Sequence, residues 1–429
     1  MFPAHAHSVQ PTAAGGNPTH LERVSMLRRL YGSGMAETFD AIVIGAGVVG
    51  ASTAFHLAKL GGLKVCVVER GQVCTGGTAK SCAIVRTHYS VPSNTALTVR
   101  SLAMFDAFQE WLEDGEADAG FVPSGYLILA PEGDFATRMR ANLALQSDAG
   151  AETFVVSPEE ALARHPLLNL DDVAIIAYEP RSGYADPYST TTSFLRAARA
   201  KGVVVKTDCS VQSLAVTSGR ITGVRTARGD LHAPLVVSAA GPWTRALTDG
   251  IGLDIPLEIS RHTVLTFKAA APYGRELPVI KDLTTANKMY FRPASGGVVL
   301  VGTGDYGDPV TDADAMDENV DDDFVLLQGG QLGHRMAPFA EAALTASWIG
   351  AYDITPDWNP VLGPVPEVEG LHLAVGFSGH GFKLAPTVGL VLAQTALGQT
   401  ADVDIAPYRL GRFADNQLLV GAYGVGSIS

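Results

Sequence analysis

Residues 41–50 read AIVIGAGVVG, and the segment that they begin decides the fold. The apolar run Ala41–Ile44 predicts a buried strand, because no polar residue interrupts it. A helix is expected to follow over about Val49–Leu60 and to end at the glycine pair that starts at Gly61. Lys64–Val68 then predicts a second strand. Together these elements form a complete β-α-β unit of about 30 residues.

The turn inside this unit fits the pattern G-x-G-x-x-G, with glycines at 45, 47 and 50. Gly45 permits the tight turn, Gly47 lets the backbone approach a pyrophosphate, and Gly50 lets the helix pack on the strand. Val48 and Val49 open the helix, whose free N–H groups and positive dipole end attract phosphates. The pattern therefore predicts a dinucleotide site.

Glu69 ends the second strand, where an acid accepts hydrogen bonds from ribose hydroxyls. An acid at this position disfavours NADP, and Arg70 beside it is expected to be a solvated neighbour at the edge of the same site. The motif alone does not separate NAD from FAD.

Overall composition narrows the class of protein. The chain has 429 residues and a formal charge of -13, so nucleic-acid binding is not expected. Its 4 cysteines show no zinc spacing and no redox pair, which suits a reducing compartment, and no metal site is predicted. No apolar run is long enough for a membrane span. The expected location is the cytoplasm.

Beyond the first unit, the sequence predicts further helices and a larger share of strands. Amphipathic spacing predicts one helix over Asn94–Glu113, and Asp186-Pro187 opens another over Tyr188–Lys201. Val203–Val237 reads as an antiparallel meander. Further elements are expected as strands over Gly125–Ala130, Leu257–Phe267, Lys288–Arg292, Gly297–Gly302 and Leu371–Val375, and as helices over Ser157–His165, Phe324–Met336 and Lys383–Leu397. Asp312–Asp323 reads as an acidic surface stretch.

Four separated motifs carry a family resemblance. They are GGTAKSCAIVR at 76–86, GYADP at 183–187, VSAAGPW at 237–243 and GFSGHGFK at 376–383. Together they resemble the D-amino-acid oxidase-like superfamily, and within it the sarcosine, dimethylglycine and glycine oxidase branch. The resemblance implies an α/β fold in which a discontinuous Rossmann-like FAD-binding domain carries an inserted antiparallel-sheet substrate domain.

The expected boundaries follow from the order of these elements. Residues 37–120, 180–250 and 352–429 are assigned to the FAD-binding domain, and 121–179 and 251–351 to the substrate domain. Residues 1–36 are expected to be a flexible N-terminal extension.

The resemblance also implies site residues. Besides the first turn, the expected FAD contacts are Thr78, Ala79, Lys80, Ser81, Val211, Ala240, Gly241, Trp243, Gly379, His380, Gly381, Phe382 and Lys383. Arg86 and Lys383 are implied to hold a substrate carboxylate, and Tyr352 falls where relatives place an active-site tyrosine. The alternatives are a structural ion pair for Arg86, a solvent-facing Lys383 and a packed core Tyr352. His262 is expected to be structural.

Two departures from the family pattern bear on the chemistry. Ser81 and Gly350 stand where some relatives carry a histidine or cysteine bound to flavin, and Cys82 is out of register, so noncovalent FAD is predicted. Leu300 stands where a relative carries a dioxygen-activating lysine. The electron acceptor is therefore left open between dioxygen and another acceptor, such as a quinone or a partner protein.

The predicted activity is oxidation of the C–N bond of a small amino acid or N-methyl amino acid bearing a carboxylate. Hydride passes to FAD, and the imine product hydrolyses. Three alternatives stay open: a flavin-dependent 2-hydroxy-acid oxidoreductase, an NAD-dependent enzyme, and a noncatalytic FAD-binding subunit of a larger amine oxidase. A homo-oligomer or a partner subunit is possible within the predicted class.

Overall fold

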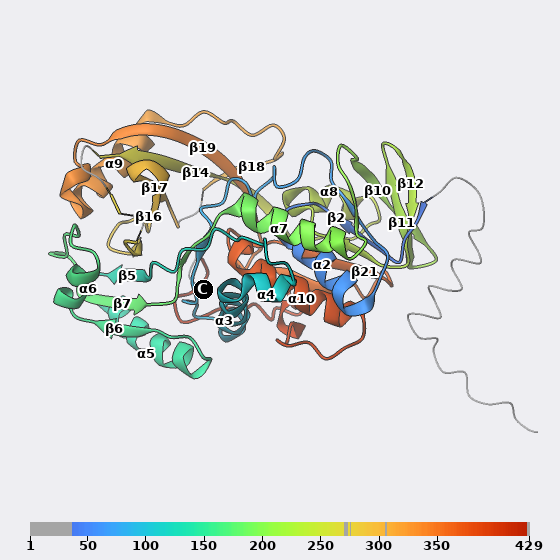
Figure 1. The fold of residues 1–429 in the computed structure, drawn as a ribbon, viewed down its shortest axis with the longest axis horizontal. Coiled ribbons are helices and arrows are strands. Elements are labelled where there is room, and N and C mark those ends of the chain that lie inside the picture. Colours follow the sequence, from blue (N-terminus) through green and yellow to red (C-terminus); the bar gives the residue numbers. More distant parts are fainter. Residues whose placement is uncertain (1–36, 270–272, 275, 305–306, 427–429) are drawn as a thin grey trace, which may run out of the picture.

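The computed structural model describes residues 37–269, 273–274, 276–304 and 307–426. The extension predicted over residues 1–36 lies outside the described residues. Figure 1 shows an elongated molecule with one large sheet toward each end, joined in the middle by helices and connecting segments. No helix in the described part of the chain combines the length and apolar character needed to cross a bilayer.

The first sheet contains the predicted β-α-β unit. Its six strands run in the order β20-β21-β13-β2-β3-β9, and all neighbouring pairs are parallel except β20 with β21. The strands are β2 (Ala41–Ile44), β3 (Val65–Val68), β9 (Val204–Lys206), β13 (Val236–Ser238), β20 (Val361–Pro364) and β21 (Leu371–Val375). All residues of β2 and β3 are buried, as expected for the interior of a parallel sheet.

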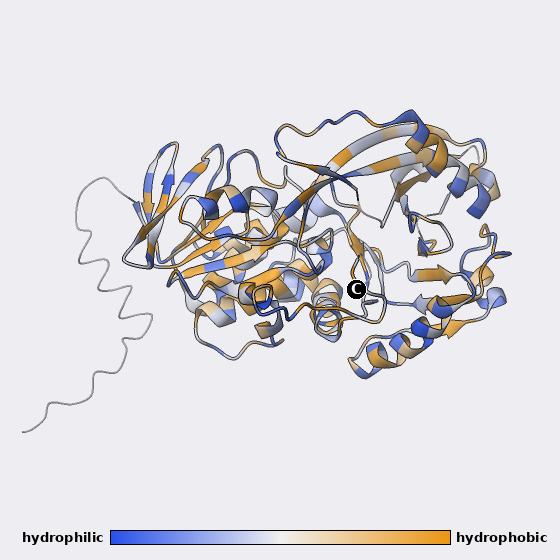
Figure 2. Cartoon of the chain, turned by 180° about the vertical axis from the view of Figure 1, so that it is seen from behind, coloured by the Kyte–Doolittle hydropathy of each residue, from blue (hydrophilic) through white to orange (hydrophobic). Residues whose placement is uncertain are grey.

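Helices cover one face of this sheet. They are α2 (Val48–Gly61), α3 (Pro92–Asp106), α4 (Phe108–Leu112), α7 (Pro187–Ala200) and α10 (Gly381–Ala396). Helices α2 and α10 cross closely, since a Cβ atom on Gly389 would lie 2.2 Å from Ser52 Oγ. Figure 2 shows that these helices and the strands beneath them carry much of the hydrophobic colouring.

The opposite face is covered mainly by β structure. A four-stranded sheet, ordered β1-β12-β11-β10, packs there with α8 (Thr244–Asp249). Its strands are β1 (Glu37–Thr38), β10 (Val211–Thr217), β11 (Arg220–Thr226) and β12 (Gly229–His232). The meander predicted over Val203–Val237 is therefore only partly right, because β9 and β13 leave it and join the parallel sheet.

The second large sheet has nine strands and is antiparallel apart from one parallel pair, β5 with β15. Its order is β18-β14-β17-β16-β15-β5-β7-β6, and β19 pairs with β14. The strands are β5 (Tyr126–Ala130), β6 (Phe154–Val156), β7 (Ile175–Glu179), β14 (Glu258–Lys268), β15 (Val279–Asp282), β16 (Tyr290–Ala294), β17 (Val298–Gly302), β18 (Asp308–Val310) and β19 (Ala343–Ile354).

Alternation along these strands gives the nine-stranded sheet two different faces. Leu127, Ile280, Phe291 and Val301 point to one face, where they pack with α6 (Pro158–Arg164) and α9 (Asp322–Arg335). Lys281 is adjacent in sequence to Ile280, so its side chain points to the other face. That second face looks toward the first sheet and bounds the candidate site.

The connections also explain how the two sheets are interleaved. The six-stranded sheet takes strands from residues 41–68, 204–238 and 361–375, whereas the nine-stranded sheet takes them from 126–179 and 258–354. A two-stranded sheet of β4 (Ile84–Val85) and β8 (Gly183–Tyr184) lies where the chain passes between them. Strand β19 runs through the boundary predicted at 351–352.

Two local features differ from the expectations. The helix predicted over Asn94–Glu113 is two helices, α3 and α4, because Ala107 has φ −115 and ψ 39 and interrupts the helical path. Helix α5 (Asp134–Asp148) was not predicted; it buries only Met139, Asn142, Leu143 and Gln146, too few apolar residues for a clear pattern. The helix predicted over Ser157–His165 is present as α6, and a capping box between Ser157 and Glu160 begins it.

Candidate active site

The glycine-rich turn has the close contacts that its sequence predicts. Gly45 has φ +102, and a Cβ atom there would lie 2.5 Å from the Ala239 carbonyl oxygen. A Cβ atom on Gly50 would lie 2.0 Å from the Gly45 carbonyl oxygen, so this glycine permits the packing of α2 on β2. Only glycine suits these positions without a shift of the backbone.

The N-terminus of α2 and the end of β3 meet at this turn. No side chain caps α2 at Gly47, and the backbone N–H of Val48 donates to Thr78 Oγ1 at 3.1 Å. The Glu69 carboxylate accepts hydrogen bonds from the N–H groups of Ala46, at 2.8 Å, and Gly71, at 2.9 Å. The acid is therefore held in place beside the helix N-terminus, where the sequence predicts a ribose contact.

A cavity of about 450 Å³ starts at this turn and is called here the larger cavity. It reaches from the turn to the loop before α10. Most of the predicted cofactor-binding residues line it: Gly45, Gly47, Val48, Val49, Glu69, Arg70, Thr78, Lys80, Ser81, Val211, Ala240, Gly241, Trp243, Gly379, Gly381 and Phe382. Gly50 and Ala79 are not among the lining residues, and His380 and Lys383 line a neighbouring cavity instead.

One end of the larger cavity is bordered by a cluster that the sequence did not indicate. Arg70 forms a bidentate ion pair with Asp314, with both N–O distances 2.8 Å, and its guanidinium lies 3.8 Å from the centre of a Trp243 ring. Trp243 Nε1 also donates to Asp314 at 3.0 Å. The acidic stretch predicted as plain surface therefore contributes Asp314 to the cavity lining.

A second cavity, of about 70 Å³, is called here the smaller cavity. Ser81, Tyr352, Gly379 and Phe382 line both cavities, so the two are adjacent. Arg86, Lys383 and His380 line only the smaller cavity. The three residues implied to be catalytic, Arg86, Lys383 and Tyr352, therefore all line the smaller cavity.

Two of these residues are buried cations. Arg86 follows β4, is 6% exposed, donates to the His88 carbonyl and stacks on Tyr89 at 4.2 Å. Lys383 lies in the first turn of α10 and is 7% exposed, so it does not point to solvent. Burial and the nearby charges of Arg86 and Lys281 hold the pKa of Lys383 well below its usual range. A carboxylate beside them would favour the protonated amine.

Tyr352 stands at the junction of the two cavities. Its ring stacks on His262 with centroids 3.7 Å apart and planes at 17°. Gly379 has φ +82, and a Cβ atom there would lie 2.4 Å from the Tyr352 ring, so the glycine makes room for the tyrosine. His262 lines the larger cavity, and burial lowers the pKa of its imidazole to about 4, which keeps the ring neutral.

His380 occupies the N-cap position of α10, where its side chain makes no capping hydrogen bond, and it lines the smaller cavity. Its Nδ1 is 2.8 Å from the Tyr89 hydroxyl, which fixes the orientation of the ring. Burial, with the charges of Lys383, Arg86 and Lys281, holds the pKa of His380 well below its usual value. The imidazole is therefore neutral and takes part in hydrogen bonding rather than in charge pairing.

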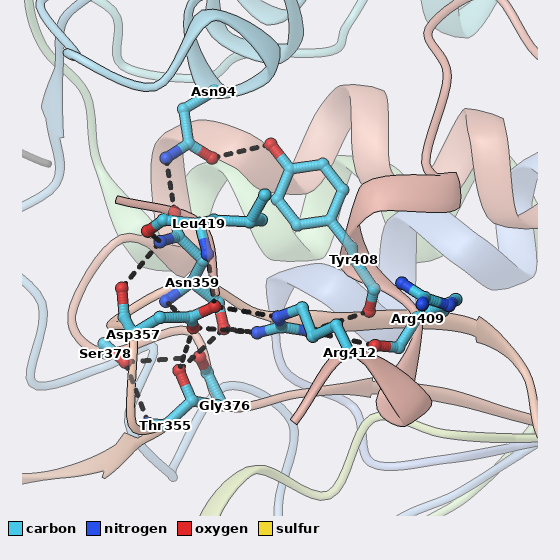
Figure 3. A network of polar contacts seen from close by, with 10 residues as sticks. All are labelled: Asn94, Thr355, Asp357, Asn359, Gly376, Ser378, Tyr408, Arg409, Arg412 and Leu419. Carbon is cyan, nitrogen blue, oxygen red and sulfur yellow. Dashed lines mark hydrogen bonds and ion pairs between the residues drawn. The ribbon is translucent and has the colours of Figure 1, made fainter. Parts of the chain in front are cut away.

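A buried polar network supports the loop that carries Gly379 and His380 (Figure 3). At its centre Arg412 binds Asp357 through two N–O contacts of 2.8 and 2.9 Å, and both side chains are fully buried. Thr355 donates from Oγ1 to the Asn359 carbonyl, and its backbone N–H donates to Ser378 Oγ, in the active-site loop, at 3.3 Å. The C-terminal segment is thereby linked to the active-site loop.

Other residues named in the sequence have clear positions. Gly350 lines the larger cavity, whereas Cys82 lines the smaller one, with its Sγ 3.2 Å from the Tyr290 hydroxyl. Leu300 is buried against Cys82 and Val264 and is not among the lining residues of either cavity.

Lys281 and Tyr290 line the smaller cavity and were not singled out from the sequence. Tyr290 lies in the strand predicted over Lys288–Arg292, whereas Lys281 lies outside every predicted strand. The only available signal for Lys281 was a charged pair, Lys281-Asp282, directly after the apolar residues Val279 and Ile280.

Comparisons with known proteins agree with this geometry. The chain is 29% identical over 420 residues to FAD-dependent oxidoreductase domain-containing protein 1 of Bos taurus, covering 88% of this chain and 85% of that protein. It is 27% identical to human mitochondrial sarcosine dehydrogenase over 88% of this chain but only 42% of that enzyme. The structure of L-proline dehydrogenase from P. horikoshii superposes with a TM-score of 0.82 and 26% identity, covering 90% of this chain and 100% of that one.

The residues at the larger cavity fit FAD. Glycines crowd the turn where a pyrophosphate needs close backbone approach, an acid stands at the ribose position, and the cavity continues to the adjacent smaller cavity. The family model for FAD dependent oxidoreductases matches residues 40–395. FAD rather than NAD is therefore the cofactor, and the chain belongs to the FAD dependent oxidoreductase family, DAO.

Proposed function

We propose that the protein oxidises the C–N bond of a small amino acid or N-substituted amino acid. The observation that supports this most directly is the position of Arg86 and Lys383 in the smaller cavity, next to the cavity that fits FAD. A guanidinium and an ammonium suit a carboxylate in a buried site. That the substrate is an amine is inferred from the relatives. Two of them are named for sarcosine and proline, which are both secondary amines with one carboxylate.

The residues of the chain act mainly by binding and orientation. Arg86 and Lys383 hold the carboxylate, and Tyr352 lines both cavities, beside the point where substrate and cofactor would meet. The amine reacts in its neutral form, so a dry pocket and correct alignment suffice without a dedicated general base. FAD, when bound, takes the hydride from the carbon next to nitrogen. The N–H proton is lost, and water hydrolyses the imine to a carbonyl compound and an amine.

Paired substrates test the amine against the alternative of a 2-hydroxy acid. Purified FAD-loaded protein is mixed without oxygen with glycine, sarcosine or proline, and separately with glycolate or lactate. We expect the amines to bleach the flavin absorbance and the hydroxy acids to leave it unchanged. Bleaching by hydroxy acids alone would overturn the proposal, and bound FAD that no substrate bleaches would favour a noncatalytic subunit.

The electron acceptor is part of the same proposal. Leu300 supplies no charge to either cavity, which favours an acceptor other than dioxygen. Peroxide release under air, compared with reduction of a dye under argon, distinguishes dioxygen from another electron acceptor. Noncovalent FAD is supported by Gly350 at the larger cavity, and acid precipitation should release the yellow cofactor into solution. The cytoplasmic location stays a prediction.

A further inference from the structure

Three side chains meet where the larger cavity opens to solvent. Arg70, Trp243 and Asp314 all line this cavity, and the side chains of Arg70 and Asp314 are also 44% and 54% exposed. Residues that line a cavity and also reach solvent lie at its opening, which is called here the rim. Because Arg70 directly follows Glu69, this part of the rim lies beside the predicted ribose position.

Each of the three side chains contacts the other two. Arg70 donates from both terminal nitrogens to the two oxygens of Asp314, at 2.8 Å each, and its guanidinium lies 3.8 Å from the centre of a Trp243 ring. Trp243 completes the set by donating from Nε1 to Asp314 at 3.0 Å. Bidentate pairing and stacking on an aromatic face both fix the orientation of a guanidinium. The cluster therefore has one defined geometry although it is partly exposed.

The members of the cluster come from parts of the chain that build different sheets. Arg70 is the second residue after β3, and Trp243 ends a short 3-10 helix that follows β13. Both of those strands belong to the six-stranded sheet. Asp314 lies between β18 and α9, in the part of the chain that builds the nine-stranded sheet. The ion pair therefore joins segments of two different sheets at the rim.

Further contacts hold the acidic segment that carries Asp314. Glu318 lies 3.8 Å from Lys80, which itself lines the larger cavity. From β14, Arg261 donates from Nε to the Asp317 carbonyl at 2.8 Å. Asp314 is thus presented to Arg70 by a segment that has contacts of its own on both sides.

We propose that the cluster of Arg70, Trp243 and Asp314 is a clasp that retains FAD, with Asp314 as its positioning residue. Because the ion pair joins segments of two sheets at the opening, FAD leaves more readily when the pair is broken. Exposed ion pairs are weak and are screened by salt, so the clasp makes FAD release faster at high ionic strength. This inference rests on the binding of FAD and not on the amine proposed as substrate.

Electrostatic repulsion alone predicts the opposite effect of Asp314. FAD carries a negatively charged pyrophosphate, so a carboxylate at the rim would repel it, and removal of that charge would slow its release. A clasp instead predicts faster release when Asp314 loses its charge. The sign of the change therefore distinguishes the two explanations.

The rate of FAD release tests the proposal without turnover. FAD-loaded protein is mixed with an excess of apo-glucose oxidase, which becomes active when it takes up the FAD that is released. Asp314→Asn keeps the size of the side chain and an oxygen that can accept from Trp243. We expect it to release FAD about fivefold faster than the wild type at about 50 mM salt, the upper end of what an exposed pair provides. At about 0.5 M salt the wild type should approach the rate of the variant, which itself should change little.

Asp322→Asn is the matched control, because it removes the same charge from an exposed position in the first turn of α9. It should leave the rate of release unchanged. Unchanged or slower release from Asp314→Asn, or an equal acceleration by Asp322→Asn, would overturn the proposal.

A double-mutant cycle assigns the effect to the ion pair. Arg70→Met should also accelerate release, and the variant with both changes should release FAD no faster than the faster single variant, because both changes break the same pair. Effects that multiply would show that the two residues act separately and would contradict the clasp. Because release is measured and not oxidation, failure of amines to bleach the flavin would leave the clasp standing, and loss of the clasp would leave the proposed reaction standing.

Discussion

The ion pair between Arg412 and Asp357 offers a direct test of how the C-terminal segment stabilises the site (Figure 3). Both side chains are 0% exposed, and Arg412 also donates to the carbonyls of Asn359 at 2.7 Å and Tyr408 at 3.0 Å. Replacing Arg412 by Met keeps an unbranched apolar chain but leaves the Asp357 carboxylate without its cation. Breaking a buried pair in this way costs about 3–5 kcal/mol.

The lower end of that range is expected here. The N–H groups of Leu419 and Asn359 still donate to Asp357, at 3.0 and 3.1 Å, and partly satisfy the carboxylate. A loss of about 3 kcal/mol is nevertheless a large part of the 5–15 kcal/mol that typically separates folded from unfolded protein. Arg409→Met is the matched control, because its partner Asp415 is 53% exposed and surface pairs contribute about 0–1 kcal/mol.

Urea unfolding of the FAD-loaded protein, followed by circular dichroism at a fixed excess of FAD, measures the loss. The pH supplies a second test. Burial acts to raise the pKa of Asp357, but Arg412 holds it below its usual value in the wild type. Without Arg412 that pKa rises, and the carboxylate takes up a proton at mildly acidic pH. The loss of unfolding free energy in Arg412→Met, relative to the wild type, should therefore become smaller as the pH falls from about 8 to about 5.5. A loss no larger than that of Arg409→Met, or one independent of pH, would refute the reasoning.

Three further changes have expected outcomes. Gly45→Ala places a Cβ atom 2.5 Å from a backbone oxygen and should abolish FAD retention in purified protein, whereas Gly62→Ala, with nothing within 4 Å, should keep the cofactor at a cost of about 1 kcal/mol. In the wild type, binding of methylthioacetate, a monocarboxylate with sulfur in place of the amine, should weaken as rising pH deprotonates Lys383. Lys383→Met should weaken this binding and remove its pH dependence. An unchanged pH profile in the variant would contradict the role of Lys383. Burial raises the pKa of Asp353 from 3.8 to about 6, so its contribution to stability is present at low pH and is lost as the pH rises through 6. Asp353→Asn should therefore gain about 2 kcal/mol relative to the wild type between about pH 4.5 and pH 7.5 in urea unfolding, and a constant difference would show that Asp353 does not titrate there.

The features that could be predicted from the sequence are those specified by residues close together in the chain or by recognisable motifs. The turn from β2 into α2 is specified by residues within 10 positions of one another, and its glycine contacts appear as expected. The resemblance motifs placed Arg86, Lys383 and Tyr352, which lie far apart in the chain, around one cavity.

The site residues that could not be predicted from the sequence depend on contacts between segments far apart in the chain. Lys281 reaches the smaller cavity because β15 lies between β16 and β5, and β5 is more than 140 residues earlier in the chain. No local pattern specifies that parallel pair. Asp314 likewise joins the larger cavity through Arg70 and Trp243, contacts that an acidic stretch by itself does not reveal.

The central claim is that hydride leaves a carbon next to nitrogen and reaches FAD. The most direct measurement is the rate of flavin bleaching, without oxygen, by an amine substrate and by the same amine carrying deuterium on that carbon. The claim predicts bleaching by both and a severalfold slower rate for the deuterated compound, because the C–H bond breaks in the step observed. Bound FAD that stays oxidised in the presence of every carboxylate-bearing amine would contradict it.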